Sequence, residues 1–163
     1  MSNQIELKKA NIIDIDEIIN MYAERMRWFK ENEIKQWSKY LTNHSKSEFE
    51  QAIENGNYYI LTKNDNIIAG FEISTDSHYW NDDTTNAYYL YKIVVKVGYK
   101  NIGKEIFEFA KQIAKENKKD YLRIDCVSSN KKLNQIYNKH GFEYVREGKD
   151  YYNYTLRECK VNE

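Results

Sequence analysis

The chain has 163 residues, with 25 basic and 25 acidic side chains, so its formal net charge is zero. This length predicts one domain over residues 1–163, and the charge balance argues against a nucleic-acid partner, since a dedicated binder shows a clear basic excess. No apolar run is long enough to span a bilayer, and residues 1–9 lack the apolar stretch of a signal peptide. We therefore expect no membrane partner and a cytoplasmic location.

Composition adds three expectations. Cys126 and Cys159 fit a reducing cytoplasm as free thiols. Proline is absent while Asn, Lys, Ile and Tyr are abundant, which we interpret as the AT-rich codon usage of a bacterial gene. His44, His78 and His140 show no metal-ligand spacing, so we expect no metal.

The first third of the chain predicts one strand and two helices. Residues 5–8 predict a short strand, and an amphipathic helix follows from Asp14. Ser47-Glu48-Phe49-Glu50 has the spacing of a capping box and predicts a short helix that ends near Asn55-Gly56. The apolar positions of the first helix recur at intervals of three and four: Ile15, Ile18, Ile19, Tyr22, Met26 and Phe29.

The middle of the chain is dominated by strand patterns. Residues 57–63 and 66–74 flank Asn64-Asp65, which predicts a β-hairpin. The polar residues 76–86 predict a loop, and the aromatic and β-branched residues 87–95 predict a strand.

The last third alternates between helix and strand. The predicted elements are a helix over 102–117, a strand over 121–127, a helix over 130–140 stopped by Gly141, and a closing hairpin of 142–146 with 151–156. This order predicts an α/β or α+β domain built around a mixed sheet.

Two of the chain's six glycines lie in VGYKNIGKEIF, residues 97–107. We call residues 96–102 the glycine loop. A strand, a short turn and a helix start together form an anion site, because the first helical N–H groups lack partners and the helix dipole is positive there. The alternative is that Gly98 only makes a turn and Gly103 only relieves packing. Neither a Walker motif nor a G-x-G-x-x-G fingerprint is present. Three lysines lie in or beside the loop: Lys96, Lys100 and Lys104.

Residues 93–116, IVVKVGYKNIGKEIFEFAKQIAKE, resemble the acyl-CoA motif of the GNAT superfamily of N-acetyltransferases. That motif runs from a strand through [Q/R]-x-x-G-x-[G/A] into a helix. Residues 121–145 resemble the family's second half, with an Asn that opens a helix and Tyr-x-x-x-Gly-Phe that closes it. The resemblance covers nearly the whole chain. It implies a central mixed, largely antiparallel twisted sheet of six to seven strands with about four helices.

The resemblance also implies acetyl-CoA as acetyl donor, bound by the strand and the glycine loop. Two registers are open. Lys100–Glu105 fills the motif without gaps, with Lys for Arg or Gln and Glu105 for Gly or Ala. Ile102–Phe107 matches the family's Ile-Gly-x-x-Leu-Leu if the loop is two residues shorter, and we prefer this register because it keeps the helix face apolar. The implied cofactor-binding residues are Ile93, Val94 and Val95 through their backbone, Lys100, Asn101, Ile102, Gly103, Lys104, Glu105 and Asn130.

Tyr137 matches the family's tyrosine that protonates the departing CoA thiolate, although its spacing with Leu133 and Ile136 also suits a core residue. Asn130 suits a helix cap as well as a contact to the pantetheine arm. Cys126 alternates with core positions and has no histidine partner in any recognisable signature, so we do not expect a cysteine nucleophile.

The acceptor side is implied by residues 25–37. Its Trp28…Gln36-Trp37 pattern resembles a small bacterial GNAT subgroup, so Trp28 and Trp37 are expected to line the acceptor site. Tyr91, on the strand over 87–95, is expected to line the same site. Glu72 is the expected catalytic proton acceptor. The alternatives are buried anchoring for Trp28 and simple exposure on a strand for Glu72.

We therefore expect an N-acetyltransferase that moves acetyl from acetyl-CoA to a primary amine, on a small molecule or a peptide amino terminus, by direct attack. One alternative is a non-catalytic CoA-binding or sensor protein of the same fold. The other is an RNA- or protein-interaction domain that uses the fifteen tyrosines for stacking. The acceptor and the choice between monomer and homodimer stay open.

Overall fold

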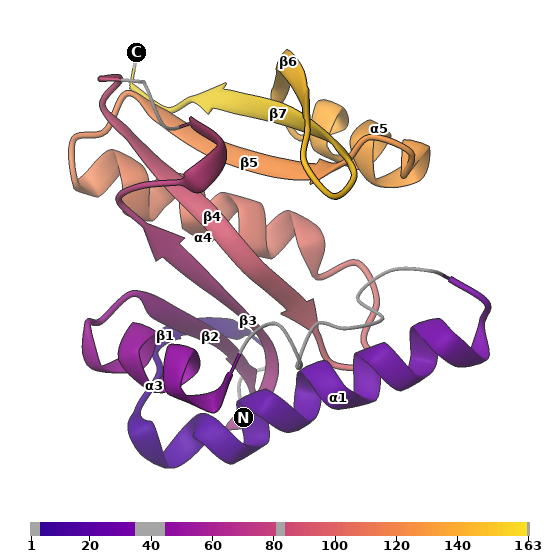
Figure 1. Ribbon diagram of the computed structural model, residues 1–163. Helices are drawn as coiled ribbons and strands as arrows, with labels where there is room; N and C mark the ends of the chain where they lie inside the picture. Colours follow the sequence, from indigo (N-terminus) through magenta and orange to yellow (C-terminus); the bar gives the residue numbers. More distant parts are fainter. Residues whose placement is uncertain (1–3, 35–44, 81–83, 163) are drawn as a thin grey trace. The chain divides into compact units, whose positions relative to one another are not determined.

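The computed structural model describes residues 4–34, 45–80 and 84–162. The described residues form seven strands and four α-helices, as expected, in a mixed and mostly antiparallel sheet of strand order β1-β2-β3-β4-β5-β7-β6 (Figure 1). The chain comprises two compact units. Unit 1 consists of Met1–Glu72 and Lys92–Ile106, and unit 2 consists of Ile73–Tyr91 and Phe107–Glu163.

The predicted strands and helices are found close to their expected bounds, and two short 3-10 helices, η1 and η2, were not predicted. In chain order the elements are β1 (Ile5–Lys9), η1 (Ile12–Asp14), α1 (Ile15–Glu31), α3 (Lys46–Glu54), β2 (Tyr58–Lys63), β3 (Asn66–Ser74), η2 (His78–Trp80), β4 (Ala87–Val95), α4 (Gly103–Glu116), β5 (Tyr121–Val127), α5 (Lys131–Lys139), β6 (Glu143–Lys149) and β7 (Asn153–Lys160).

The helix α3 begins two residues earlier than its sequence predicts. Its N-cap is Ser45, whose side-chain oxygen accepts a hydrogen bond from the Glu48 N–H at 3.3 Å, so the predicted cap at Ser47 is wrong. Ser45 and Ser47 offer the same chemistry. The extended backbone of Ser45, with φ −77° and ψ 159°, makes it the residue that stands outside the helix.

Replacing Ser45 with Ala is expected to lower the free energy of unfolding by about 1 kcal/mol, because the Glu48 N–H loses its side-chain acceptor and keeps the Ser45 carbonyl. Ser47→Ala is the matched control, since Ser47 is an exposed residue inside the helix. Urea unfolding of both variants measures the difference. Equal stability of the two variants would show that the Ser45 cap contributes nothing.

The hairpin of β2 and β3 has the predicted two-residue turn. Asn64 and Asp65 both have positive φ, 51° and 65°, as a type I′ turn requires. Lys63 pairs with Asn66 across the turn. The turn sets the register next to it, and an irregularity between Leu61 and Thr62 shifts the register of the part of the hairpin that carries Glu72.

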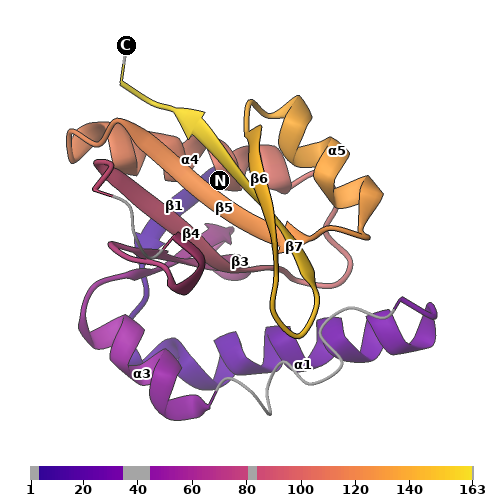
Figure 2. The same cartoon turned by 45° about the horizontal axis from the view of Figure 1, so that its top comes forward.

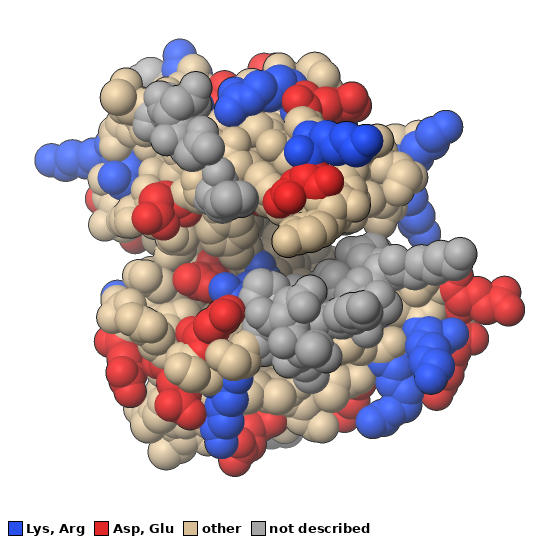
Figure 3. Space-filling view, viewed as in Figure 1, with Lys and Arg blue, Asp and Glu red and all other residues tan. Residues whose placement is uncertain are grey.

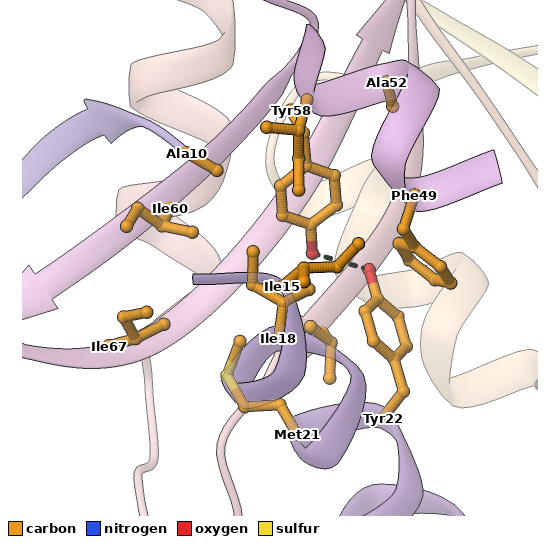
Figure 4. Close-up of a cluster of buried hydrophobic side chains, with 12 residues drawn as sticks. Ala10, Ile15, Ile18, Met21, Tyr22, Phe49, Ala52, Tyr58, Ile60 and Ile67 are labelled. Atoms are coloured by element: carbon orange, nitrogen blue, oxygen red, sulfur yellow. Dashed lines mark hydrogen bonds between the residues drawn. The ribbon is translucent and has the colours of Figure 1, made fainter. Parts of the chain in front are cut away.

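The core of unit 1 lies between α1, α3 and the first strands (Figure 4). Tyr22 of α1 and Tyr58 of β2 are fully buried, and their hydroxyl oxygens are 2.9 Å apart. The Tyr22 ring lies 5.1 Å from the Phe49 ring of α3. The Tyr22 hydroxyl also donates to the carbonyl oxygen of Lys92 in β4. The core thus holds the end of β4, the strand that leads into the glycine loop.

Unit 2 contains the first part of β4, the strands β5, β6 and β7, most of α4, and α5. β5 pairs with β7 along its whole length, from Tyr121↔Lys160 to Val127↔Tyr154, and β7 pairs with β6 (Figure 2). The pairing with β5 extends β7 four residues beyond the predicted end of the strand at residue 156, which a local pattern does not reveal. Between the helices and this sheet, the Phe107 ring lies 5.6 Å from Tyr137 and 5.3 Å from Phe142.

Within unit 2, the parallel pairing of β4 with β5 is short. It runs from Ala87↔Tyr121 to Tyr89↔Arg123, whereas β4 continues through Leu90 and Tyr91 and β5 continues to Val127. The two strands of the described unit thus separate after Tyr89 and Arg123.

The surface has no single dominant charge on the face that Figure 3 shows, where Lys and Arg side chains lie among Asp and Glu. This mixture agrees with the balanced composition. Of the helices in the described ranges, none is long and apolar enough to cross a membrane.

Candidate active site

The end of β4 in unit 1 departs from regular strand geometry. Lys92 has φ 54°, a left-handed conformation that a lysine rarely adopts, and it bends the strand just before Ile93. Val94 is buried in the core, while Ile93 and Val95 are half-buried. The Val95 carbonyl oxygen accepts two hydrogen bonds from Arg25 of α1, at 3.1 Å from Nε and 2.8 Å from Nη2.

The glycine loop follows and brings the chain to the start of α4. Gly98 has φ 100° and Asn101 has φ 61°, so two of its residues are left-handed. The residue before α4 is the buried Ile102, whose carbonyl accepts from the Ile106 N–H at 3.1 Å. An isoleucine side chain cannot accept a hydrogen bond. The first N–H groups of α4, on Gly103 and the next residues, therefore lack the usual side-chain cap.

This geometry agrees with the preferred register of the glycine loop. If Gly103 is the last position of [Q/R]-x-x-G-x-[G/A], the motif's first glycine falls on Asn101 and its Arg or Gln falls on Gly98. Asn101 supplies the left-handed conformation that glycine provides most readily. Ile106 and Phe107 are buried, so the α4 face is apolar in this register.

The charges around this helix start are mixed. Lys100 and Lys104 are exposed and Lys96 is half-buried. Glu105 lies in the first turn of α4, and its Oε2 atom is buried without a hydrogen-bond partner among the residues that the structure describes. A carboxylate here opposes an anion, whereas the free N–H groups and the lysines favour one.

Tyr137 of α5 is buried in unit 2, 6% exposed, with edge contacts to Phe107 and Phe142. Within the described part of the chain, the Tyr137 hydroxyl makes no hydrogen bond. Its oxygen is not fully buried, so the hydroxyl keeps some contact with solvent. Burial raises the pKa of this phenol well above its usual range, and the nearby Cys126 and Asp125 add to the effect. The hydroxyl therefore stays protonated and is available as a donor.

The other predicted polar residues of unit 2 have clear structural partners. Asn130 is the N-cap of α5, and its side-chain oxygen accepts from the Leu133 N–H at 3.0 Å. The Cys126 thiol lies 3.3 Å from the Asn134 side-chain oxygen. Burial raises the pKa of Cys126 to about 11, so the thiol stays protonated at neutral pH and is a poor nucleophile.

Glu72 is half-buried and forms an ion pair with Lys92. Its Oε1 atom lies 2.6 Å from Lys92 Nζ, and the two side chains are 14% and 15% exposed. The lysine is the residue that bends β4. Glu72 and Lys92 thus form an ion pair at the bend of β4.

The predicted acceptor residues fall in different parts of the chain. Trp28 is half-buried in unit 1, with the Arg25 guanidinium 5.0 Å from its ring centre. Trp37 lies outside the described residues. Tyr91 belongs to unit 2, where its hydroxyl donates to the Asp76 carbonyl at 3.3 Å.

Sequence reasoning overlooked Asp125 of β5. Burial raises the pKa of this carboxyl from 3.8 to about 6. In YLRIDCV the alternation puts Asp125 on the same strand face as Arg123 and opposite to Cys126, but this placement alone does not mark it as a site residue. Among the described residues, no group of three or more His, Cys, Asp or Glu side chains could hold a metal ion.

The sheet thus combines a strand that is bent near its end, a loop with left-handed residues and a helix preceded by an apolar residue. The chain belongs to the GNAT acetyltransferase family, since the model described as "Acetyltransferase (GNAT) domain" matches residues 26–155.

Similar proteins agree with this assignment. The "Uncharacterized N-acetyltransferase YesJ" of Bacillus subtilis (strain 168) is 22% identical over 156 residues, which cover 91% of this chain and 86% of that protein. A GNAT-family acetyltransferase from Listeria monocytogenes 4b F2365 is 27% identical, with a TM-score of 0.82 over 96% of this chain and 94% of that one. The PaiA N-acetyltransferase of Thermoplasma acidophilum, in complex with coenzyme A, is 21% identical, with a TM-score of 0.72 over 96% of this chain and 99% of that one.

Proposed function

We propose that this GNAT acetyltransferase moves an acetyl group from acetyl-CoA to a primary amine, by direct attack of the amine on the thioester. The observation that carries the proposal is the start of α4, where an apolar residue, Ile102, precedes a helix whose first N–H groups have no side-chain cap. A pyrophosphate suits such a site, because its oxygens accept from these N–H groups and its charge meets the positive end of the helix dipole.

The bent end of β4 supplies the second part of the donor site. The backbone of Ile93, Val94 and Val95 binds the pantetheine arm in this proposal, and Asn130 contacts the same arm while it caps α5. The Val95 carbonyl already accepts from Arg25, so its place in the cofactor site requires Arg25 to share or release that bond. The remaining contacts come from the glycine loop and the first turn of α4, Lys100 to Glu105.

Direct attack is favoured over an acetyl-enzyme because the described part of unit 2 offers no activated nucleophile. The Cys126 thiol is protonated and bonded to Asn134. Tyr137 donates a hydrogen bond, and then its proton, to the sulfur that leaves as the C–S bond breaks. The amine nitrogen forms the new bond to the acetyl carbon and releases the proton that restores Tyr137.

Glu72 has a different role from the one its sequence position suggests. Because Lys92 already neutralises it at 2.6 Å, we assign the pair to positioning the bend of β4 rather than to accepting the amine's proton. Trp28 shapes the acceptor side together with Arg25.

Calorimetric titration with acetyl-CoA tests the proposed donor site. The native protein is expected to bind with a micromolar Kd, which corresponds to about −8 kcal/mol. Gly103→Trp is expected to abolish binding, since an indole at the first residue of α4 covers the free N–H groups. Gly103→Ala, which adds one methyl group, is the matched control and is expected to retain binding.

Two results would contradict the proposal. A native protein that does not bind acetyl-CoA would favour a non-catalytic member of the family. Binding that survives Gly103→Trp would place the cofactor elsewhere on the chain. Thermal melting of both variants separates a blocked site from a misfolded one.

A further inference from the structure

Asp125 is a carboxylate without a hydrogen-bond or ion-pair partner among the described residues. It lies on β5 opposite Leu156 of β7 and is half-buried. In the described ranges no hydrogen bond or ion pair satisfies its oxygens, yet neither oxygen is sealed from solvent. Desolvating a carboxylate without pairing it is unfavourable, so a feature of this kind points to a partner that comes from outside the chain.

Asp125 lies beside a cluster of aromatic side chains in unit 2. Leu156, its partner on β7, belongs to a core cluster against which Tyr79, Tyr91 and Tyr154 pack. The charge of Asp125 also contributes to the raised pKa of Tyr79 and of Tyr91. Their hydroxyls bond elsewhere, Tyr91 to the Asp76 carbonyl at 3.3 Å and Tyr79 to the Tyr152 hydroxyl at 3.4 Å. The Tyr79 ring also lies 4.1 Å from the Tyr154 ring.

The nearest basic residue on the same strand face is already engaged. Arg123 Nε lies 2.9 Å from Glu158 Oε1, and Arg123 Nη1 lies 3.2 Å from the Tyr89 hydroxyl. Its guanidinium is also stacked 4.0 Å from the Trp80 ring centre. Arg123 is therefore held by other groups and does not neutralise Asp125.

Asp125 lies just beyond the paired part of β4 and β5. The pairing of β4 with β5 ends at Tyr89↔Arg123, and Tyr91 and Asp125 are the next residues that point to the same face of their strands. Asp125 thus follows the point where the two strands of unit 2 separate.

We propose that Asp125, with the rings of Tyr79, Tyr91 and Tyr154, binds the ammonium group of the acyl acceptor, which is an alkyl or arylalkyl amine without a carboxylate beside its nitrogen. A cation gains both from the carboxylate and from the aromatic faces, whereas a neighbouring carboxylate would be repelled. This inference rests on the proposed function and names the substrate class of the same enzyme.

The test uses four probes: phenethylamine, butylamine, the neutral 2-phenylethanol, and phenylalanine, which adds a carboxylate to phenethylamine. Each is titrated calorimetrically into the full-length protein without acetyl-CoA, and thiol release is then followed with acetyl-CoA. The variants are Asp125→Asn and a matched control, Asp120→Asn. Asp120 precedes β5 and accepts from the Asn162 side chain at 2.9 Å.

The expected result is that at least one amine binds the native protein about 10–100-fold more tightly than 2-phenylethanol and phenylalanine do, as expected for a charge-assisted contact. Asp125→Asn removes this preference, and Asp120→Asn keeps it. In the transfer assay the KM for the amine rises in Asp125→Asn while the Kd for acetyl-CoA is unchanged.

The inference is overturned if the native protein binds neither amine, if phenylalanine binds as well as phenethylamine, or if Asp125→Asn binds the amine like the native protein. These outcomes do not depend on acetyl-CoA. A native protein that binds the amine but not acetyl-CoA supports this inference and contradicts the proposed function alone.

Discussion

Replacing Tyr137 with Phe is expected to lower kcat by about 10²–10⁴-fold, the range for loss of one positioned proton donor. The change removes the hydroxyl and keeps the ring. The contacts with Phe107 at 5.6 Å and Phe142 at 6.1 Å, which make Tyr137 a core residue, are therefore retained. Because no hydrogen bond to the hydroxyl occurs in the described part of the chain, its loss leaves no other buried group unsatisfied.

Turnover with a saturating amine and acetyl-CoA measures this effect. Tyr144→Phe makes the same chemical change at an exposed position of β6, 56% exposed, and is expected to leave kcat unchanged. The melting temperature of Tyr137→Phe should match that of the native protein. An unchanged kcat in Tyr137→Phe would remove this residue from the mechanism and leave it a core residue only.

Replacing Asp125 with Asn is expected to raise the free energy of unfolding at pH 7.5 by up to about 3 kcal/mol. Burial raises the pKa of this carboxyl from 3.8 to about 6. Between these values the folded chain holds a proton that the unfolded chain has released, so stability falls as pH rises through this window. Above pH 6 the Asp125 carboxyl is charged in the folded native protein, so the free energy of unfolding is lowered by the full cost of burying that charge. The neutral Asn side chain does not have this cost.

Urea unfolding at pH 4 and pH 7.5 measures the difference. The stability gained by Asp125→Asn should be large at pH 7.5 and small at pH 4, where the carboxyl is protonated in the folded state and partly protonated in the unfolded state. Asp120→Asn, which alters a carboxylate with a hydrogen-bond partner, is expected to give no such gain. A gain that is the same at both pH values would show that the buried charge is not its source.

Most of the fold follows from local patterns. The alternation in YLRIDCV predicts β5 with its observed bounds, and Asn64-Asp65 predicts the turn between β2 and β3. The pattern misplaced the start of α3, because Ser45 and Ser47 are chemically identical caps and only the backbone geometry distinguishes them. The full length of β7 depends on its pairing with β5, a contact between distant residues.

The candidate site was less predictable. Asn130 as a cap and Tyr137 as a buried residue follow from helical spacing. The pairing of Glu72 with Lys92 does not, because it depends on a left-handed lysine in the middle of a strand. Asp125 was overlooked because a single Asp in a strand has no distinctive pattern, and its missing partner is visible only once the neighbouring strands and rings are in place.

The start of α4 has a consequence for how this protein diverges over evolution. Ile102 leaves the first amide groups of the helix unclaimed, and amide groups are the same whatever side chain a residue carries. Substitutions in that turn change its surroundings but not its donors. A lineage can therefore replace most of its side chains and still inherit the same backbone donors, as long as the helix begins at the same residue.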